Sequence, residues 1–213
     1  AGTVVDLAGV AVVGVVDSQN VTLSNGALAH GVPSVLIAGS ADIELRDTRI
    51  QSNETGVAVV GSTRVRLAGL TLEGGITCIR FENGRLNSAV GVNTSLCIQA
   101  VLTRGWESDL VVERLTLNGS GHIAFFEGTN LTLLNSTVSG TFDVGATNAQ
   151  LRYGRSGPAV VERGNPQHVR FVNVLFEAVE VAGEFENTSN ITLRNVTIRQ
   201  AASGLLFKQT AHV

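Results

Sequence analysis

Two glutamates near the end of the sequence have the spacing of an acid and base pair. Glu184 and Glu186 flank Phe185 in a run of alternating apolar residues, and on a strand two such residues face the same side about 7 Å apart. That distance lies in the range of about 6.5–9.5 Å between the carboxyl groups of inverting glycoside hydrolases. The interpretation that we favour is a solvated acidic strip, with Val181 and Phe185 facing inward from the other side of the strand.

The other residues suited to chemistry occur singly. His122 and His168 have the side chain of a general base, although an isolated histidine is more often a surface or hydrogen-bonded residue. Trp106, beside Glu107 and Asp109, has the ring needed to stack on a sugar, or packs a loop. We therefore predict no catalytic centre, no metal site and no cofactor, and we favour a noncatalytic protein. The aspartates are scattered along the chain, at Asp6, Asp17, Asp42, Asp47, Asp109 and Asp143.

A recurring eight-residue phrase indicates the elements that position these side chains. It reads apolar, any, apolar, any, Asn/Asp/Gly, any, any, apolar, and the starts at 21, 43 and 65 are 22 residues apart. The period of two predicts a short strand with one buried face, and the fifth residue suits a tight turn with left-handed dihedrals. Copies begin at Val5, Val21, Ile43, Val65, Leu131, Val169 and Ile191, and the copy at Leu110 has Arg114 in the fifth place.

A second strand follows between the copies and opens with glycine, as in residues 56–59 and 204–207, and no useful length shows helical periodicity. A coil of about 20 to 22 residues, whose short strands pair with the coils above and below, is the rung of a solenoid. The sequence predicts an all-β fold in a single domain over residues 1–213, a parallel β-helix of about nine or ten rungs. Irregular rungs or loops are expected near residues 83–109 and 139–168.

With this repeat the chain resembles the right-handed parallel β-helix, or pectate-lyase-like, superfamily, which includes polygalacturonases, lyases, phage tailspikes and surface proteins. The resemblance implies a right-handed solenoid and a structural ladder of stacked asparagine side chains at the fifth place of the phrase. The motifs of the polysaccharide-degrading branches are not met: there is no Asp-Asp pair and no Arg-x-Lys, and Gly121-His122 is followed by Ile. The ladder positions are Asn25, Asp47, Asn135, Asn173 and Asn195.

The register of the rungs can be checked against charge. If rungs superimpose at 22 residues, Asp42 lies beside Arg64 and Glu44 beside Arg66, because the acids flank Ile43 as the arginines flank Val65. Opposite charges then meet twice in one column. Exposed pairs contribute only about 0 to 1 kcal/mol each, so they specify the register more than they stabilise it.

The two cysteines indicate a compartment. Cys78 and Cys97 are 19 residues apart, close to one rung, and adjacent rungs place Cα atoms about 5 Å apart, within the reach of a disulfide. We predict a disulfide bond; the alternative is a pair of buried free thiols, as in a cytosolic protein.

The acceptor motif for N-glycosylation, Asn-x-Ser/Thr, occurs nine times, where composition alone gives about two or three. One explanation is the β-helix repeat, which favours Asn before a strand and Thr within it; the other is heavy glycosylation. We favour glycosylation, because four of the sites lie outside the phrase. Asn135 and Asn195 occupy ladder positions, where we expect buried side chains closed to glycosylation. The predicted carriers are Asn20, Asn53, Asn93, Asn118, Asn130, Asn187 and Asn190.

Charge and hydropathy exclude several classes of function. A net charge of −3 with scattered arginines provides no basic surface for nucleic acid, and no apolar run reaches the roughly 18 to 20 residues of a membrane span. The start at Ala1, without Met or leader, leads us to expect a processed chain or a segment of a longer one.

These observations lead to one predicted function. We predict a noncatalytic, N-glycosylated β-helix scaffold, secreted or on the cell surface, that self-associates through its ends into a fibre or surface layer, because the repeat reaches both ends of the chain. The alternative is a polysaccharide-active enzyme, a lyase or glycoside hydrolase, or a carbohydrate-binding module.

Overall fold

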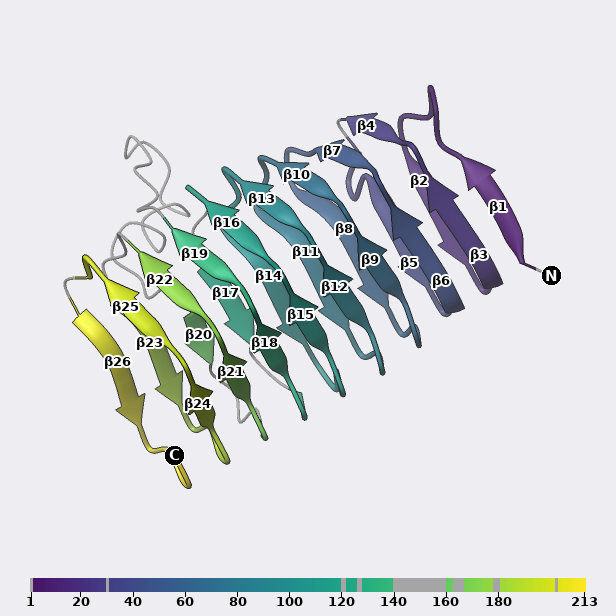
Figure 1. Ribbon diagram of the computed structural model, residues 1–213. Coiled ribbons are helices and arrows are strands. Elements are labelled where there is room, and N and C mark those ends of the chain that lie inside the picture. Colours follow the sequence, from purple (N-terminus) through teal and green to yellow (C-terminus); the bar gives the residue numbers. More distant parts are fainter. Residues whose placement is uncertain are drawn as a thin grey trace.

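The chain forms a rod of stacked coils made from three parallel β-sheets, with the N-terminus at one end and the C-terminus at the other (Figure 1). The computed structural model describes residues 2–29, 31–119, 122–125, 128–139, 160–162, 167–177, 181–201 and 203–213. Its described residues contain strands, turns and bends, and no α-helix. Each complete coil contributes one strand to each sheet, so neighbours within a sheet are three strands apart in sequence.

The three sheets are named here by their strands. Sheet A contains β1 (Thr3–Asp6), β3 (Gln19–Ser24), β6 (Ala41–Arg46), β9 (Arg66–Ala68), β12 (Ser88–Val90), β15 (Val111–Glu113), β18 (Thr132–Leu134), β21 (Arg170–Val172) and β24 (Thr192–Arg194). Sheet B contains β2 (Val13–Val16), β5 (Val35–Ala38), β8 (Thr55–Val60), β11 (Thr77–Glu82), β14 (Gln99–Arg104), β17 (His122–Phe125), β20 (Val160–Glu162), β23 (Val181–Glu186) and β26 (Ser203–Lys208). Sheet C contains β4 (Ala27–Ala29), β7 (Arg49–Gln51), β10 (Thr71–Glu73), β13 (Asn93–Ser95), β16 (Thr116–Asn118), β19 (Thr137–Ser139), β22 (Leu175–Glu177) and β25 (Thr197–Arg199).

The rod has about eight turns, the number of strands in sheet C. The prediction of nine or ten was slightly too high for two reasons. The first coil contributes no strand to sheet C. In addition, Ile123 of β17 pairs directly with Val160 of β20, a separation of 160 − 123 = 37 residues in place of the usual 22.

One continuous hydrophobic core runs along the inside of the rod. Because side chains alternate across each strand, every second residue of a strand enters this core and stacks on its equivalent one coil away. In sheet A the buried column is Leu23, Leu45, Leu67, Ala89, Val112, Leu133 and Phe171. Near the C-terminal end the core is aromatic: Phe185 meets Phe171 edge to face at 5.7 Å and stacks on Phe207 at 5.0 Å between ring centroids.

The corner that follows sheet A, called here the post-A corner, has the left-handed backbone that the fifth place of the phrase predicts. Asn and Asp adopt positive φ at a smaller cost than other residues with a Cβ, and Gly has no such cost. Arg114, with φ 52°, is the exception in the column. The post-A corner comprises Asn25, Asp47, Gly69, Gly91, Arg114, Asn135, Asn173 and Asn195, all with φ between 50° and 63°.

Further columns of left-handed residues line the rod, and two of them flank sheets A and B. The pre-A corner, just before sheet A, comprises Asn20, Asp42, Arg64, Leu86, Asp109, Asn130, His168, Asn190 and His212. The post-B corner, just after sheet B, includes Asp17, Gly39, Gly61, Asn83, Gly105, Asn187 and Gln209. These columns define which side chains turn outward at each bend.

Three asparagines of the post-A corner are joined by side-chain hydrogen bonds. Asn173 Nδ2 donates to Asn135 Oδ1 at 2.8 Å, and Asn195 Nδ2 donates to Asn173 Oδ1 at 3.0 Å. All three side chains are exposed, which corrects the expectation that Asn135 and Asn195 are buried. The reason is local: the next residue along the chain, as at Ser136, occupies the interior of the turn, so the left-handed residue lies on its outer side.

One of the two segments expected to be irregular continues the regular stack. Residues 83–109 include β12, β13 and β14, which continue all three sheets, and a register shift between Gln99 and Val101 marks the pairing with β17. Most of residues 139–168 lie outside the described part of the chain.

Candidate functional site

The charged residues of sheet A pair across coils as the repeat predicts. Arg64 Nη2 donates to Asp42 Oδ2 at 2.8 Å, and Arg66 Nε lies 3.4 Å from Glu44 Oε1. Hydrogen bonds from Arg64, and secondarily from Gln19, lower the pKa of Asp42 to about 2. The carboxylates of Asp42 and Glu44 are each paired with an arginine of the next coil. These pairs therefore serve the register of the coils, and neither carboxylate is placed as a free proton donor or acceptor.

The candidate acid pair lies in β23 near the C-terminal end. In the strand register Glu184 pairs with Val161 on one side and Leu206 on the other, while Glu186 pairs with Lys208. The Glu186 side chain is half-buried; the Glu184 side chain lies outside the described part of the chain. The spacing of the two carboxyl groups therefore stays a prediction.

The remaining candidates are dispersed along the rod. His168 is exposed in the pre-A corner, and Trp106 is 86% exposed, with its backbone N–H donating to Asn83 Oδ1 at 3.0 Å. His122 begins β17, and its side chain lies outside the described residues. His168 and Trp106 thus lie at different coils and do not form one site. In the described residues no three His, Cys, Asp or Glu side chains are grouped to hold a metal ion.

A buried carboxylate, that of Glu107, directly follows Trp106 in the chain, and its burial was not predicted from the sequence. Glu107 is 1% exposed; its Oε1 accepts a hydrogen bond from Asn87 Nδ2 at 2.8 Å, and its Oε2 accepts one from the Gly84 backbone N–H at 2.8 Å. Burial raises the pKa of Glu107 to about 7, although both hydrogen bonds oppose that shift.

The signal for this burial lies in the register of the coils. Ser108 pairs with Arg85, and Arg85 with Thr63, so Glu107 takes the place of Ser62, which is fully buried. Four steps separate the left-handed residues Gly105 and Asp109, where three separate Gly61 and Arg64; the extra residue is the exposed Trp106, and Glu107 keeps the inward position.

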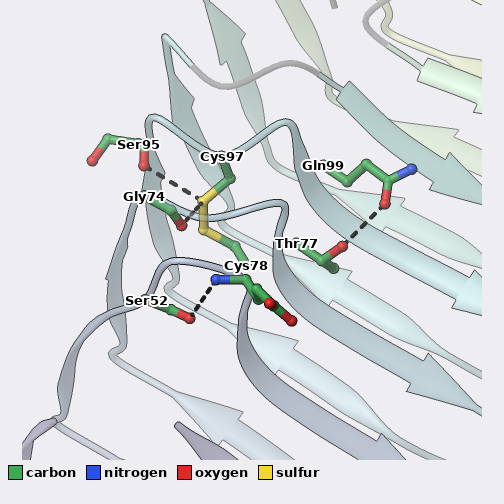
Figure 2. The surroundings of a disulfide bond; sticks show 8 residues. Ser52, Gly74, Thr77, Cys78, Ser95, Cys97 and Gln99 are labelled. Carbon is green, nitrogen blue, oxygen red and sulfur yellow. Dashed lines mark hydrogen bonds between the residues drawn. A yellow bond between two sulfur atoms is a disulfide. The ribbon is translucent and has the colours of Figure 1, made fainter. Parts of the chain in front are cut away.

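The disulfide prediction is confirmed: Cys78 and Cys97 form a bond between adjacent coils, with Cα atoms 5.8 Å apart (Figure 2). Cys78 lies in β11, and Cys97 lies in the corner between β13 and β14. Both residues are buried. The bond closes a loop at the coil in which Thr77 Oγ1 donates to Gln99 Oε1 of the next strand at 3.0 Å.

The nine acceptor asparagines fall into two structural groups. Six occupy left-handed corners, namely Asn20, Asn130, Asn135, Asn187, Asn190 and Asn195. Asn53, Asn93 and Asn118 do not have positive φ; all three are exposed, and the last two lie on the outer face of sheet C. The backbone requirement accounts for six of the nine, which leaves three (9 − 6), about the number expected by chance. The number of motifs therefore does not by itself indicate glycosylation.

Both ends of the rod present unpaired strands with half-exposed apolar side chains. At the N-terminal end the edges are β1, β2 and β4, and Val5, which faces the inside of the coil, is 37% exposed. At the C-terminal end the edges are β24, β25 and β26, and Phe207 is 40% exposed, with one ring face stacked on Phe185. In an interior coil these positions are fully buried.

No protein-family model matches the chain, and no curated protein matches its sequence. Solved structures do match. The Streptococcus pneumoniae surface protein and adhesin PfbA is similar with a TM-score of 0.66 at 8% identity, over 92% of this chain and 63% of PfbA. The chain is a right-handed parallel β-helix.

Two polysaccharide-degrading enzymes share the β-helix. A Family 28 exopolygalacturonase from Yersinia enterocolitica matches with a TM-score of 0.62 at 12% identity, over 92% of this chain and 45% of the enzyme. The catalytic domain of a GH87 α-1,3-glucanase matches with a TM-score of 0.54 at 12% identity, over 88% of this chain and 46% of that domain. This chain thus spans less than two thirds of each protein, and identities this low establish the fold alone. The described residues contain no helix long and apolar enough to cross a membrane.

Proposed function

We propose that the chain is a noncatalytic extracellular β-helix scaffold that associates end to end. The observation that carries the proposal is the set of edge strands among the described residues: β1, β2 and β4 at one end of the rod, and β24, β25 and β26 at the other. Unpaired strand edges invite another strand. Coils of one solenoid type stack at a repeat of about 4.8 Å, so a second copy supplies the missing neighbour in register.

The side chains at the two ends are complementary. Phe207 and Leu205 face inward at the last strand of sheet B, and Val13 and Val15 do so at the first. Joining a C-terminal end to an N-terminal end continues the buried columns and covers the open ring face of Phe207. This contact is heterologous, so it builds a linear filament rather than a closed dimer.

Two observations support an extracellular compartment: the disulfide bond and the structural similarity to a surface protein. Cystine bonds persist in oxidising surroundings outside the cytosol, and PfbA, the first structure compared above, is a surface protein and adhesin. N-glycans, in this proposal, are confined to Asn53, Asn93 and Asn118. At the corners the side-chain nitrogen of Asn130 already donates to Asp109 and that of Asn195 to Asn173, so a glycan there breaks an existing hydrogen bond.

The test compares two lysine variants of β26. Phe207 faces the core and is 40% exposed, while its neighbour Leu206 faces outward and is 41% exposed. Phe207→Lys is expected to abolish concentration-dependent assembly in sedimentation velocity and electron microscopy, whereas Leu206→Lys, the matched control, leaves it intact.

A mixing experiment separates blocked assembly from misfolding. Phe207→Lys keeps a normal N-terminal end, and Val5→Lys keeps a normal C-terminal end. Each variant alone is expected to be a monomer, and their mixture is expected to form a one-to-one dimer and nothing longer. A wild-type chain that stays monomeric at all concentrations, or equal behaviour of Phe207→Lys and Leu206→Lys, refutes the proposal.

A further inference from the structure

The turn from sheet B to sheet A carries an apolar side chain that the stacking of the coils does not require. Trp106 is the extra residue of this turn and is 86% exposed. The coils around it stay in register, because Arg85 pairs with Ser108 just as Thr63 pairs with Arg85. Trp106 therefore adds nothing to the pairing of the coils. At this exposure it also does not pack a loop, which was one of the two roles considered for it above.

The local backbone holds the indole outward. The Trp106 N–H donates to Asn83 Oδ1 at 3.0 Å, and the Glu107 N–H donates to Gly105 O at 3.0 Å, which closes a three-residue turn with Trp106 at its tip. Position 105 requires glycine, because its φ is 64° and a Cβ there would clash with Asn83 Oδ1. The buried Glu107 carboxyl anchors the other side of the tip to the preceding coil. The tip is thus a fixed display of the single tryptophan of the chain.

A second exposed apolar side chain lies in the same turn one coil earlier. Leu86, in the pre-A corner, is 46% exposed and has φ 57°. Left-handed backbone is costly for leucine, and other coils place asparagine or aspartate at this position, as at Asp109 and Asn130. Leu86 therefore has a backbone cost and buries only part of its side chain in return. Neither the register nor the core accounts for its presence.

The charged groups of this turn leave one cation without a partner. Arg85 Nε lies 3.7 Å from Asp109 Oδ2, and Asp109 Oδ1 accepts a hydrogen bond from Asn130 Nδ2 at 2.8 Å. Arg104, two residues before Trp106, is exposed, and its side chain has no ion-pair or hydrogen-bond partner in the described part of the chain. The turn therefore presents two apolar groups and a free guanidinium.

These features select the class of partner. Pockets for small molecules are concave, whereas Trp106 stands out from the surface. A sugar stacked on the indole needs acceptors for its hydroxyl groups, and Asn83 Oδ1 already accepts from Trp106, while Glu82 is paired with Arg80 at 3.6 Å. A stable protein interface buries about 800 Å² on each partner, which is more than one indole and one leucine side chain supply.

We propose that this turn contacts a lipid surface, with Trp106 and Leu86 entering the interfacial layer of a membrane and Arg104 meeting lipid phosphate. Tryptophan is enriched at membrane–water interfaces, because its ring is apolar and its N–H can remain hydrogen-bonded. Arginine is attracted by anionic headgroups. A fluid lipid surface yields around a protruding side chain, so the contact requires no preformed pocket. The inference goes beyond the scaffold proposal and does not depend on end-to-end assembly.

The experiment mixes the full chain with phosphatidylcholine vesicles, with and without phosphatidylserine. Binding is measured by vesicle flotation and by the fluorescence of Trp106, which no other tryptophan masks. We expect the emission to shift to shorter wavelength and to be quenched by brominated phosphatidylcholine. Phosphatidylserine is expected to raise the affinity about fivefold, the effect of one cation near an anionic surface. Arg104→Gln is expected to abolish that gain.

Two leucine variants provide a matched comparison. Leu96 is also left-handed, with φ 57°, and is 56% exposed, but it lies in the corner between sheets C and B. Leu86→Gly is expected to weaken vesicle binding about threefold or more, whereas Leu96→Gly is expected to bind like the wild type. Glycine has no steric cost at positive φ, so both variants are expected to fold. Trp106→Ala is expected to reduce flotation about tenfold or more.

Several results overturn the proposal. One is the absence of flotation and of an emission shift with both kinds of vesicle, and another is an equal loss for Leu86→Gly and Leu96→Gly. Undiminished flotation of Trp106→Ala places the contact elsewhere on the rod. An emission shift with dextran and none with vesicles assigns a sugar to Trp106 in place of a lipid surface.

Discussion

Replacing Glu107 with glutamine is predicted to remove a fall in stability that the wild-type chain suffers as the pH rises towards neutrality. The carboxyl group is buried, and its two hydrogen-bond donors, Asn87 Nδ2 and Gly84 N–H, are both uncharged. No ion pair of Glu107 is found among the described residues. The ionised form therefore loses its hydration without gaining a counter-charge.

The sign and size of the effect follow from the pKa, which burial raises from 4.5 to about 7. Because the folded state holds the proton more tightly, the stabilising contribution is fully present below pH 4.5, declines between pH 4.5 and 7, and is lost above pH 7. The two pKa values differ by 2.5 (7 − 4.5). At about 1.36 kcal/mol for each pH unit, this difference lowers the free energy of unfolding by about 3 kcal/mol between pH 4.5 and 7.

Glutamine also introduces a defined cost. Asn87 cannot turn its amide over, because its Oδ1 accepts from Val65 N–H at 2.9 Å while its Nδ2 donates to Ser62 O at 3.2 Å. The glutamine side chain of the Glu107→Gln variant offers one oxygen to two donors, so one donor is left unsatisfied at a cost of about 1–3 kcal/mol. The variant is therefore expected to be less stable than wild type at pH 4.5 and equal or more stable at pH 8.

Urea unfolding followed by circular dichroism from pH 4.5 to 8 measures both curves. Glu54→Gln, which changes an exposed glutamate, is the matched control and is expected to keep the wild-type slope. Asp42 does not interfere, because its pKa of about 2 places its titration at more acidic pH. The slope in question is that of the free energy of unfolding against pH. If Glu107→Gln retains the wild-type slope, or if the wild-type chain has no slope beyond that of its exposed acids, Glu107 is not a buried acid with a raised pKa.

Three further predictions test other parts of the structure. Replacing Cys78 and Cys97 with serine opens a loop closed by residues 19 apart and is expected to lower the free energy of unfolding by about 3 kcal/mol, measured by urea titration. Asn173→Ala is expected to lower the melting temperature more than Asn173→Gly, because only alanine adds strain at φ 55°; equal effects would show that the amide hydrogen bonds alone matter. Peptide mapping of protein from a glycosylating host is expected to find glycan only at Asn53, Asn93 and Asn118, and glycan on Asn130 or Asn195 would contradict the corner argument.

The repeat in the sequence was sufficient to predict the solenoid, its sheet register and its left-handed corners. It succeeded because each coil meets only its neighbours, so a residue and its equivalent 22 positions later are in contact. The pairs Asp42 with Arg64 and Glu44 with Arg66 follow from that single spacing, and the disulfide follows from the closeness of adjacent coils, although its cysteines are 19 residues apart. In most proteins contacts between residues so far apart in sequence cannot be derived this way.

Departures from the repeat could not be predicted by the same reasoning. Glu107 takes an inward position that a small residue such as Ser62 fills in a regular coil, but the extra residue at Trp106 breaks the spacing, so the equivalence was hidden in the sequence. The ladder asparagines were expected inside because stacking was equated with burial, yet the hydrogen bonds between Asn135, Asn173 and Asn195 form on the outer side of the turn.

A solenoid of this kind divides its residues among a few tasks, and that division shows where function can reside. Inward columns are committed to the core, and left-handed corners are committed to the backbone, whatever side chain they carry. In the N-terminal half several outward charges of sheet A are committed to one another, as in Arg64 and Asp42. Among the described residues, the side chains left without a protein partner on that sheet include His168, Arg170 and their neighbours in the next two coils. Of these, His168 occupies a left-handed corner, so the backbone accounts for its place, whereas Arg170 stands at an exposed outward position that neither the core nor the corner requires.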